Sequence, residues 1–228
     1  LAWNDKHLLG KRDEENKAFK KDSPLAKIIK LSKFAHQEGT FGEKSGSNLI
    51  PEVVELKEDS LAVGRFEVTN AQYQSFDQRF YFPAQEANHP ALVDYDQAKA
   101  YVQWLNLQTG EDFRLPTPRE ADRLHKKGHK VAGEENTLKY WAGYDILPEQ
   151  APELRKKLVE AKISLLMPAG SFEAVKIGDA EIFDLGGNVA EIDSRGELYG
   201  YGANNCVDPG NPKRPEKASF KGFRVVRD

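Results

Sequence analysis

One stretch organises the sequence, Ile182-Phe183-Asp184-Leu185-Gly186-Gly187-Asn188-Val189-Ala190-Glu191. An apolar pair leads into a carboxylate, two glycines allow a tight turn with positive φ, and a second carboxylate follows seven residues after the first. Side-chain oxygens and backbone carbonyls of such a turn can converge on one point, and oxygens of this kind are the ligands of a hard cation such as calcium. A hairpin or loop with solvated acids has the same spacing, so the stretch alone leaves both interpretations open.

The composition is that of a globular domain and argues against two classes of partner. The chain has 228 residues, of which 39% are hydrophobic and 30% charged, with a formal net charge of -3. Because basic residues are not in excess, we expect no nucleic-acid partner. No apolar run approaches the ~20 residues of a membrane-spanning helix, so we expect no transmembrane segment. The first residue is Leu1 and not Met, so we expect a mature chain or a piece of a longer protein.

The chain divides into a flanking segment and one domain. Residues 1–48 contain a mixed charge cluster from Lys11 to Glu15, one short amphipathic helix after Pro24, and a Gly/Ser-rich run from Gly39 to Ser47. These features predict an N-terminal flanking arm or linker that packs on the domain or on a neighbouring domain. The domain itself is expected to comprise residues 49–228.

The clearest element of the domain is a helix in its middle. Asp94 or Asp96 is the expected N-cap, and Gly110 closes the helix at its C-terminal end. The apolar residues at helical spacing predict a buried stripe of Ala98, Tyr101, Val102 and Leu105.

The remaining elements are shorter and do not alternate as βαβ units. Helices are expected to begin at Thr69 or Asn70, at a capping box from Thr117 to Glu120, and at Pro148. Strands are expected at residues 53–56, 61–63, 66–68, 164–167, 171–177 and 220–226. A loop-rich α+β fold is therefore favoured over a doubly wound sheet.

Six short blocks, in a fixed order, carry a resemblance to a known family. They are Phe66-Glu67-Val68-Thr69-Asn70, Asp96 to Trp104, Arg114-Leu115-Pro116-Thr117, Tyr140-Trp141, Pro168-Ala169-Gly170-Ser171-Phe172 with Phe183 to Val189, and Gly222-Phe223-Arg224. Together they resemble the formylglycine-generating enzyme (sulfatase-modifying factor) family, whose fold is a variant of the C-type lectin fold. The resemblance implies an α+β, C-type-lectin-like fold with short strands, a few helices and much irregular loop.

The resemblance also implies a structural calcium ion at the opening stretch. In the family, the corresponding block binds calcium through the residue before the glycines, the glutamate after them, and backbone carbonyls between. Carried over by position, the ligands are Asp184, the carbonyl oxygens of Gly187 and Val189, and Glu191. Calcium bound there would stabilise a loop with little apolar content of its own.

The sequence departs from the family where the family's oxidase chemistry takes place. That chemistry uses two cysteines five positions apart, which bind copper and exchange with a substrate thiol. Here Cys206 stands near the first position and Asn211 at the second, and Met167 is the chain's one methionine. Because Cu(I) needs at least two soft sulfur ligands, copper is not expected. The tryptophans usual beside the calcium-site glutamate are replaced by Ala190 and Ile192.

Three functions are therefore weighed. The first is a non-catalytic recognition or structural module that binds a glycan, a peptide or a partner protein through the 199–215 loop region, with Tyr201, Asn204, Asn205 and Asp208 as candidate ligand-binding residues. The second is an oxidoreductase of the formylglycine-generating type, with Cys206 as a weak candidate catalytic thiol. The third is a purely structural, calcium-stabilised domain of a larger assembly of domains or subunits. The family's frequent location leads us to expect an extracytoplasmic protein, whether periplasmic, cell-surface or secreted.

Two charged residues stand inside strand-like apolar segments, Glu67 and Arg224. Charges there are seldom buried unless they are paired. We expect them to form one buried ion pair, or each to belong to one. His125 and His129 stand four residues apart, but the neighbouring lysines and Gly128 argue against a zinc site.

Overall fold

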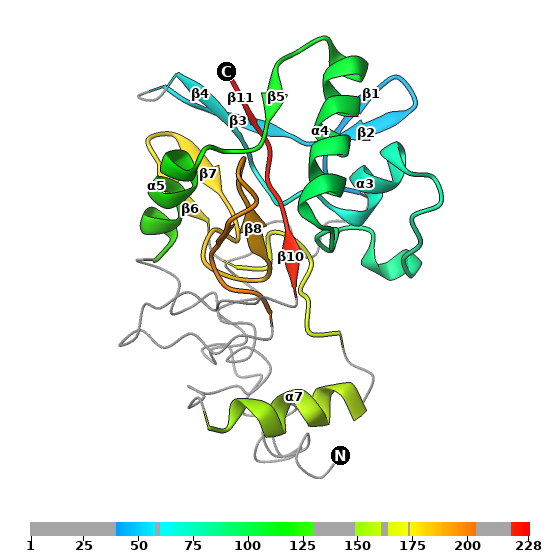
Figure 1. Ribbon diagram of the computed structural model, residues 1–228, viewed down its shortest axis with the longest axis vertical. Helices are drawn as coiled ribbons and strands as arrows, with labels where there is room; N and C mark the ends of the chain where they lie inside the picture. Colours follow the sequence, from blue (N-terminus) through cyan, green and yellow to red (C-terminus); the bar gives the residue numbers. More distant parts are fainter. Residues whose placement is uncertain (1–39, 58–59, 130–148, 161–163, 173, 204–219) are drawn as a thin grey trace.

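The computed structural model describes residues 40–57, 60–129, 149–160, 164–172, 174–203 and 220–228 (Figure 1). Within these residues helices and short strands are mixed, as expected for an α+β fold. The helices are α3 (Asn70–Phe76), α4 (Tyr95–Thr109), α5 (Pro118–His129) and α7 (Ala151–Glu160), with a 3-10 turn at Ala84–Glu86. The strands are β1 (Glu43–Ser45), β2 (Asn48–Ile50), β3 (Val53–Leu56), β4 (Leu61–Gly64), β5 (Phe113–Arg114), β6 (Val175–Ile177), β7 (Ala180–Ile182), β8 (Ala190–Ile192), β9 (Leu198–Tyr199), β10 (Lys221–Gly222) and β11 (Val226–Arg227).

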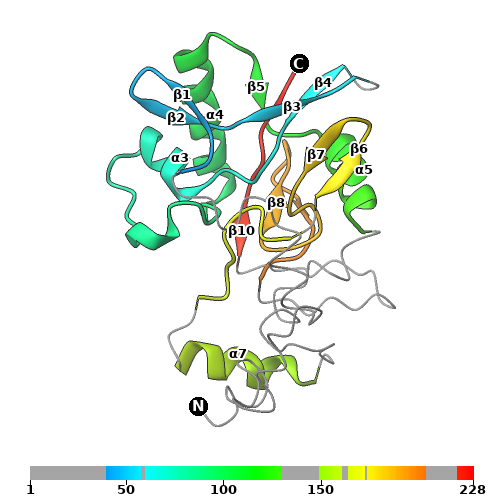
Figure 2. The same cartoon turned by 180° about the vertical axis from the view of Figure 1, so that it is seen from behind.

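The last strand of the chain lies inside the largest sheet, whose order is β3-β4-β11-β5. Strand β11 is antiparallel to both of its neighbours, with Val226 opposite Val63 on one side and Arg114 on the other. Figure 2 shows this sheet from behind, with β11 between the segments that precede and follow α4. The C-terminal residues therefore join parts of the domain that are far apart in the sequence.

The second sheet brings the C-terminal block beside the 182–191 stretch. Its order is β10-β8-β9, and β10 runs parallel to β8 with Gly222 opposite Glu191. Two hairpins complete the strands, β1 with β2 and β6 with β7. The short link between β10 and β11 thus carries the chain from one sheet to the other.

Local capping signals fix where the two best-defined helices begin. Asp94 is the N-cap of α4, where its side chain accepts a hydrogen bond from Gln97 N and Gln97 caps it in return. Gly110 ends that helix with φ 72°. In α5, Glu120 Oε2 accepts from Thr117 N at 2.7 Å, and Glu120 N donates to Thr117 Oγ1 at 3.4 Å. Both predicted helix starts are confirmed.

The main core is aromatic and is built around α4. All four predicted stripe residues, Ala98, Tyr101, Val102 and Leu105, are buried. The Tyr101 ring lies 5.3 Å from Phe223 and 5.7 Å from Tyr73, centroid to centroid. Burying each such side chain stabilises the fold by roughly 1.5–3 kcal/mol. The C-terminal Phe223 therefore anchors its segment to the helical layer.

Helix α5 runs to His129 and so passes through Gly128, a residue type that often ends a helix. Gly128 lies inside the helix and is buried. A Cβ atom at this position would stand 2.7 Å from Leu185 Cβ. The glycine therefore allows the end of α5 to pack directly on the 182–191 stretch, and this contact outweighs the usual tendency of glycine to end a helix.

Several expected strands are shorter than predicted or not formed. Residues 66–68 and 164–167 are not strands, and strand β6 begins only at Val175. The expected strand 220–226 is two strands, β10 and β11, separated by Phe223 to Val225. The interruption arises because the chain crosses between the two sheets there, with Phe223 O and Val225 O accepting from Val68 N and Gly64 N.

The first described residues pack against the domain. Phe41 stacks on Phe66 at 5.0 Å between ring centroids, and Phe66 stacks on Phe183 at 5.1 Å. The boundary expected between residues 48 and 49 falls within the β1–β2 hairpin.

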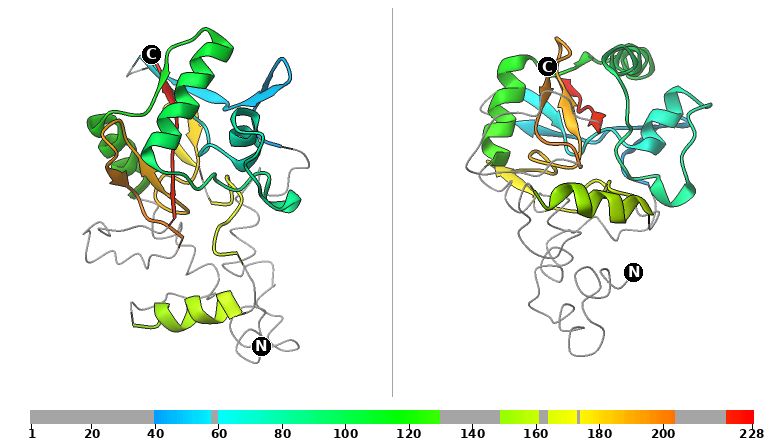
Figure 3. Two further views of the ribbon diagram at one scale, coloured as in Figure 1. Left: turned by 45° about the vertical axis from the view of Figure 1, so that its right-hand side comes forward. Right: turned by 60° about the horizontal axis from the view of Figure 1, so that its bottom comes forward.

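Helix α7 lies toward the opposite end of the molecule from β5 (Figure 3), where its Leu154 and Leu158 join a separate small core.

Candidate functional site

The 182–191 stretch leaves strand β7 and turns into strand β8. Asp184 and Asn188 both adopt left-handed backbone conformations, with φ 59° and 64°. Such conformations cost free energy in residues other than glycine, so the surrounding contacts must hold the turn. Both side chains are buried. The turn is therefore an interior feature of the protein, and the interpretation of solvated acids is wrong.

Asp184 has one satisfied and one unsatisfied oxygen. Its Oδ2 accepts a hydrogen bond from Gly170 N at 2.6 Å. Its Oδ1 is buried and has no hydrogen-bond partner among the described residues. Burial raises the pKa of Asp184 to about 7, although the hydrogen bond from Gly170 opposes that shift.

Glu191 is the negative partner of a buried ion pair. Its Oε1 accepts from Arg224 Nη2 at 2.7 Å and from Arg224 Nε at 3.0 Å. Its Oε2 lies 3.4 Å from His125 Nε2. Burial on its own would raise the pKa of Glu191, but the Arg224 guanidinium and the His125 ring outweigh burial and lower that pKa to about 2. Glu191 is therefore ionised throughout the neutral range.

Arg224 links three segments of the chain. Its side chain is fully buried. Besides Glu191, the guanidinium donates from Nη1 to Gly64 O and from Nη2 to Phe183 O, each at 2.7 Å. One side chain thus donates hydrogen bonds to Gly64 at the end of β4, to Phe183 after β7 and to Glu191 in β8. The prediction that Arg224 belongs to a buried ion pair is confirmed.

Glu67 is held by N–H groups of the turn. Its Oε1 accepts from Val189 N at 3.2 Å, and its Oε2 accepts from Asn188 Nδ2 at 3.1 Å. The alternative of a direct Glu67–Arg224 pair is wrong, because the guanidinium faces Glu191 and two carbonyl groups. Burial, together with the charges of Asp184 and Glu191, raises the pKa of Glu67 well above its usual range.

Asn188 connects the turn to the preceding 164–172 segment. Its Oδ1 accepts from Met167 N, and its Nδ2 donates to Met167 O, both at 3.0 Å. With its bond to Glu67, the Asn188 amide is satisfied on both sides. No role was predicted for Asn188, although asparagine is one of the residues that tolerate a left-handed backbone conformation.

The group formed by Glu67, Asp184, Glu191 and Arg224, here termed the charge cluster, contains three carboxyl groups and one guanidinium. Two buried negative charges would be left without a cation if all three acids were ionised. Buried charges of that kind either take up protons or are balanced by a bound cation. The raised pKa values of Glu67 and Asp184 reflect this excess.

The residues of the turn suit a calcium ion bound by mixed carboxylate and carbonyl oxygens. Asp184 Oδ1 is an orphaned buried oxygen, and Glu191 Oε2 has only the long contact to His125. Within the described residues no group of three or more His, Cys, Asp or Glu side chains is arranged to hold a metal ion. The backbone oxygens of Gly187 and Val189 would therefore have to complete the ligand set. The calcium site stays a prediction.

His125 lies close to the charge cluster. Its ring stacks on Tyr199 at 5.9 Å between centroids, and neither ring nitrogen has a hydrogen-bond partner in the described part of the chain. A Cβ atom on Gly200 would stand 3.0 Å from the ring, so glycine at that position allows close packing. The spacing of His125 and His129 gave no indication of the contact with Glu191, which depends on the fold.

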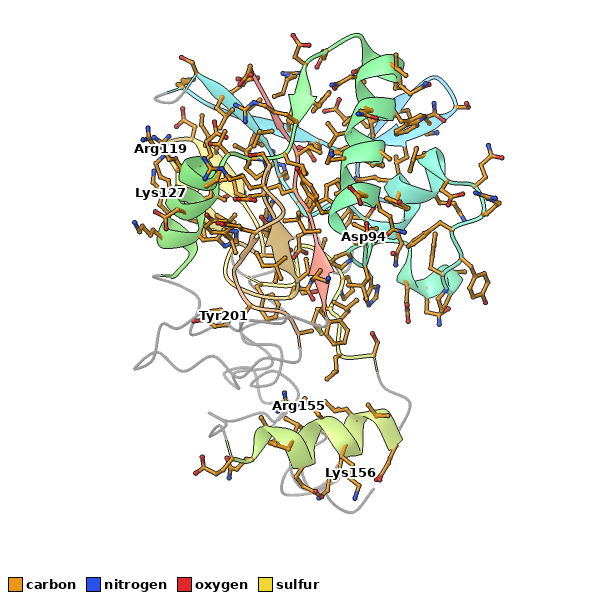
Figure 4. The ribbon with its side chains drawn as sticks, in the orientation of Figure 1. Asp94, Arg119, Lys127, Arg155, Lys156 and Tyr201 are labelled. Carbon is orange, nitrogen blue, oxygen red and sulfur yellow. The ribbon has the colours of Figure 1, made fainter. Side chains whose placement is uncertain are left out.

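The other predicted site residues are only partly described. Tyr201 is half-buried and follows β9, at the border of the described region below α5 (Figure 4). Asn204, Asn205, Cys206 and Asp208 lie outside the described residues. The described residues therefore do not test whether the predicted ligand-binding residues lie together.

No helix in the described ranges is long and apolar enough to cross a membrane.

One comparison with known proteins identifies the family. The family model of the sulfatase-modifying factor enzyme 1-like domain matches residues 35–196, which is more than half of the chain. No curated protein sequence matches the chain. The crystal structure of CarF is similar at 18% identity and a TM-score of 0.40, covering 82% of this chain and 96% of that chain. PvdO from Pseudomonas aeruginosa is similar at 17% identity and a TM-score of 0.39, covering 84% and 88%.

Proposed function

The chain belongs to the family of sulfatase-modifying factor enzyme 1-like domains, and from that membership we propose that it is a non-catalytic recognition or structural module on the family's scaffold. The observation that carries the proposal is the cysteine count. The chain contains one cysteine, Cys206, whereas the oxidase chemistry implied by the family resemblance needs a pair. A chain with one cysteine cannot supply two thiolates to a soft copper ion.

The charge cluster supports the same proposal from the structural side. Each of its acids is buried and serves as a hydrogen-bond acceptor for the backbone or for Arg224. Groups held in this way stabilise a scaffold and are not exposed to a substrate. On such scaffolds, specific binding is usually located in the loops.

We assign the binding face to the 199–215 loop region, with Tyr201, Asn204, Asn205 and Asp208 as ligand-contacting residues. A glycan, a peptide or a partner protein is the ligand class. The polar and aromatic side chains of this region suit such ligands. The region begins at Tyr199, the last residue of β9, in the sheet that also contains Glu191 of the charge cluster.

A structural calcium ion held by Asp184, Glu191 and the carbonyl oxygens of Gly187 and Val189 is part of the proposal. When bound, the ion supplies positive charge that balances the excess carboxylates of the charge cluster. The residues of this chain then orient the turn: Arg224 holds one oxygen of Glu191, and Glu67 holds the N–H of Val189.

The oxidase alternative is tested directly. The purified protein is incubated with Cu(I), oxygen and a cysteine-containing peptide, and loss of the peptide thiol is followed beside Cys206→Ser. We expect the two proteins to give the same background rate. Oxidation by the wild-type chain that disappears in Cys206→Ser would overturn the non-catalytic proposal.

Binding is tested on glycan and peptide arrays. Tyr201→Ala should lose any signal, while Tyr81→Ala should keep it, because Tyr81 is 87% exposed on a different loop. A blank array together with co-purification of a partner protein would favour a structural module over a recognition module. A signal equally reduced in both variants would contradict the assigned face.

A further inference from the structure

A groove with a cavity volume of about 260 Å³ lies along α4, away from the charge cluster. One wall is the face of α4 that begins beside Asp94, which Figure 4 labels. The other wall is the connection between β5 and α5, with one residue from the turn after β8. The lining residues are Tyr95, Lys99, Val102, Gln103, Arg114, Leu115, Thr117 and Ser194.

The groove has an apolar interior with a fixed aromatic side. Val102 and Leu115 are both buried and contribute aliphatic surface. The Tyr95 hydroxyl donates a hydrogen bond to Ser194 O at 2.8 Å, which holds the ring in place. A flat or branched apolar group can therefore be sandwiched here without reorganisation of the wall, which favours binding.

The charged groups that line the groove are both positive, and only one of them lacks a carboxylate partner among the described residues. Arg114 donates to both oxygens of Glu120, at 2.8 and 3.0 Å, and also pairs with Asp228. Lys99 Nζ lies 4.9 Å from the centre of the Tyr95 ring. No carboxylate of the described residues pairs with Lys99. The uncompensated charge at the rim is therefore that of Lys99.

We propose that this groove is a binding site for a small organic acid that carries one apolar ring. The ring lies on Tyr95, Val102 and Leu115, and the carboxylate lies at Lys99. A volume of about 260 Å³ is below the range of pockets for drug-sized ligands, roughly 300–1,000 Å³, so the ligand is small. None of the described lining residues belongs to the 199–215 region, and the site does not depend on the function proposed above.

The test uses three probes of similar size on the full chain: 3-phenylpropionate, its isostere 3-phenylpropionamide, and the cationic 3-phenylpropylamine. Methyl NMR shifts of Val102 and Leu115 report occupancy of the groove. We expect saturable binding of the acid with a dissociation constant on the order of millimolar, as is usual for a ligand of this size. The amide should bind less tightly and the amine least.

Two variants separate the charge from the apolar wall. Lys99→Gln should weaken binding of the acid about two- to fivefold, as for an exposed charge pair, and leave binding of the amide unchanged. The exposed Gln103→Trp should cover the groove and remove binding of both. Lys44→Gln, on the β1–β2 hairpin, is the matched control and should change neither.

The proposal would be overturned if the acid and the amine bound with equal affinity, or if the methyl shifts did not saturate at tens of millimolar probe. It would also be overturned if Gln103→Trp bound the acid as tightly as the unchanged protein does. Loss of binding in Lys44→Gln equal to that in Lys99→Gln would also count against it, because it would indicate a non-specific charge effect. None of these outcomes bears on the cysteine or calcium tests, so the two proposals fail separately.

Discussion

Replacing Arg224 by Met is the most direct test of the charge cluster. Methionine keeps much of the side-chain volume but removes four hydrogen bonds. Glu191 loses its two contacts with the guanidinium, and the carbonyl groups of Gly64 and Phe183 lose their donor. Since all of these groups are buried, no water molecule takes the place of the lost partner without reorganisation.

The size of the effect follows from the burial of the pair. Breaking a buried ion pair by removing one partner costs about 3–5 kcal/mol, because an uncompensated charge is left inside. Arg224 and Glu191 have side chains 0% and 3% exposed, so no discount for solvent screening applies. We expect a loss of about 4 kcal/mol in the free energy of unfolding. For a domain of this size that is a fall of roughly 10 °C in melting temperature.

The measurement is urea unfolding followed by circular dichroism, with Arg227→Met as the matched control. Arg227 lies three residues further on and pairs with Glu55 and Glu111 at the surface. Its removal should cost less than about 1 kcal/mol. Equal losses in the two variants, or a loss below 1 kcal/mol at Arg224, would refute the argument that buried charge compensation holds the sheets together.

Three further predictions concern the turn and its acids. Saturating calcium should raise the melting temperature, with about 2.7 kcal/mol of stabilisation at a calcium concentration one hundred times the dissociation constant. Asp184→Asn should abolish this rise. A melting curve that EDTA leaves unchanged would exclude the calcium site. Without calcium, the raised pKa values of Glu67 and Asp184, the latter about 7, mean that the folded state binds protons which the unfolded chain releases. The free energy of unfolding should therefore fall as pH rises from about 4 to about 7. The lowered pKa of Glu191 has the opposite sign, so it should reduce the free energy of unfolding only as pH falls below about 4. A free energy of unfolding in urea that does not change between about pH 4 and about pH 7 would contradict this assignment. Gly222→Ala would place a Cβ 2.7 Å from Val189 Cγ2, so we expect a loss of about 1–3 kcal/mol in thermal unfolding, and a neutral effect would show that the turn can shift.

Features that depend on neighbours in the sequence could be predicted. The caps of α4 and α5 depend on residues three apart, as does the capping box of α3, in which Thr69 and Gln72 cap each other. The stripe of α4 follows from the 3.6-residue period. These signals are local, so other parts of the fold cannot easily override them. The positive φ expected at the two glycines of the turn is not found there, because the left-handed positions are Asp184 and Asn188 and neither Gly186 nor Gly187 has a positive φ.

The partners of the buried charges could not be predicted, because they depend on how the sheets meet. Arg224 and Glu191 are 33 positions apart, and Glu67 and Asn188 are 121 apart. The sequence indicated that Glu67 and Arg224 need partners, but it could not show that the guanidinium faces Glu191. The break between β10 and β11 was missed for the same reason, since an apolar run does not reveal where a chain changes sheets.

The charge cluster also restricts where ligand chemistry can take place in this domain. Arg224, Glu67 and Asp184 are fully buried, and together with Glu191 they connect β4, the 182–191 stretch, β8 and the C-terminal segment. A change in any one of them should act first on stability. A change at an exposed residue such as Lys99 should act on binding with little effect on unfolding. This difference gives a criterion for separating residues of the scaffold from residues of a binding site. Variants of the charge cluster should lose ligand binding in proportion to the shift in their unfolding midpoint. Variants of the groove should lose ligand binding while their unfolding midpoint stays unchanged.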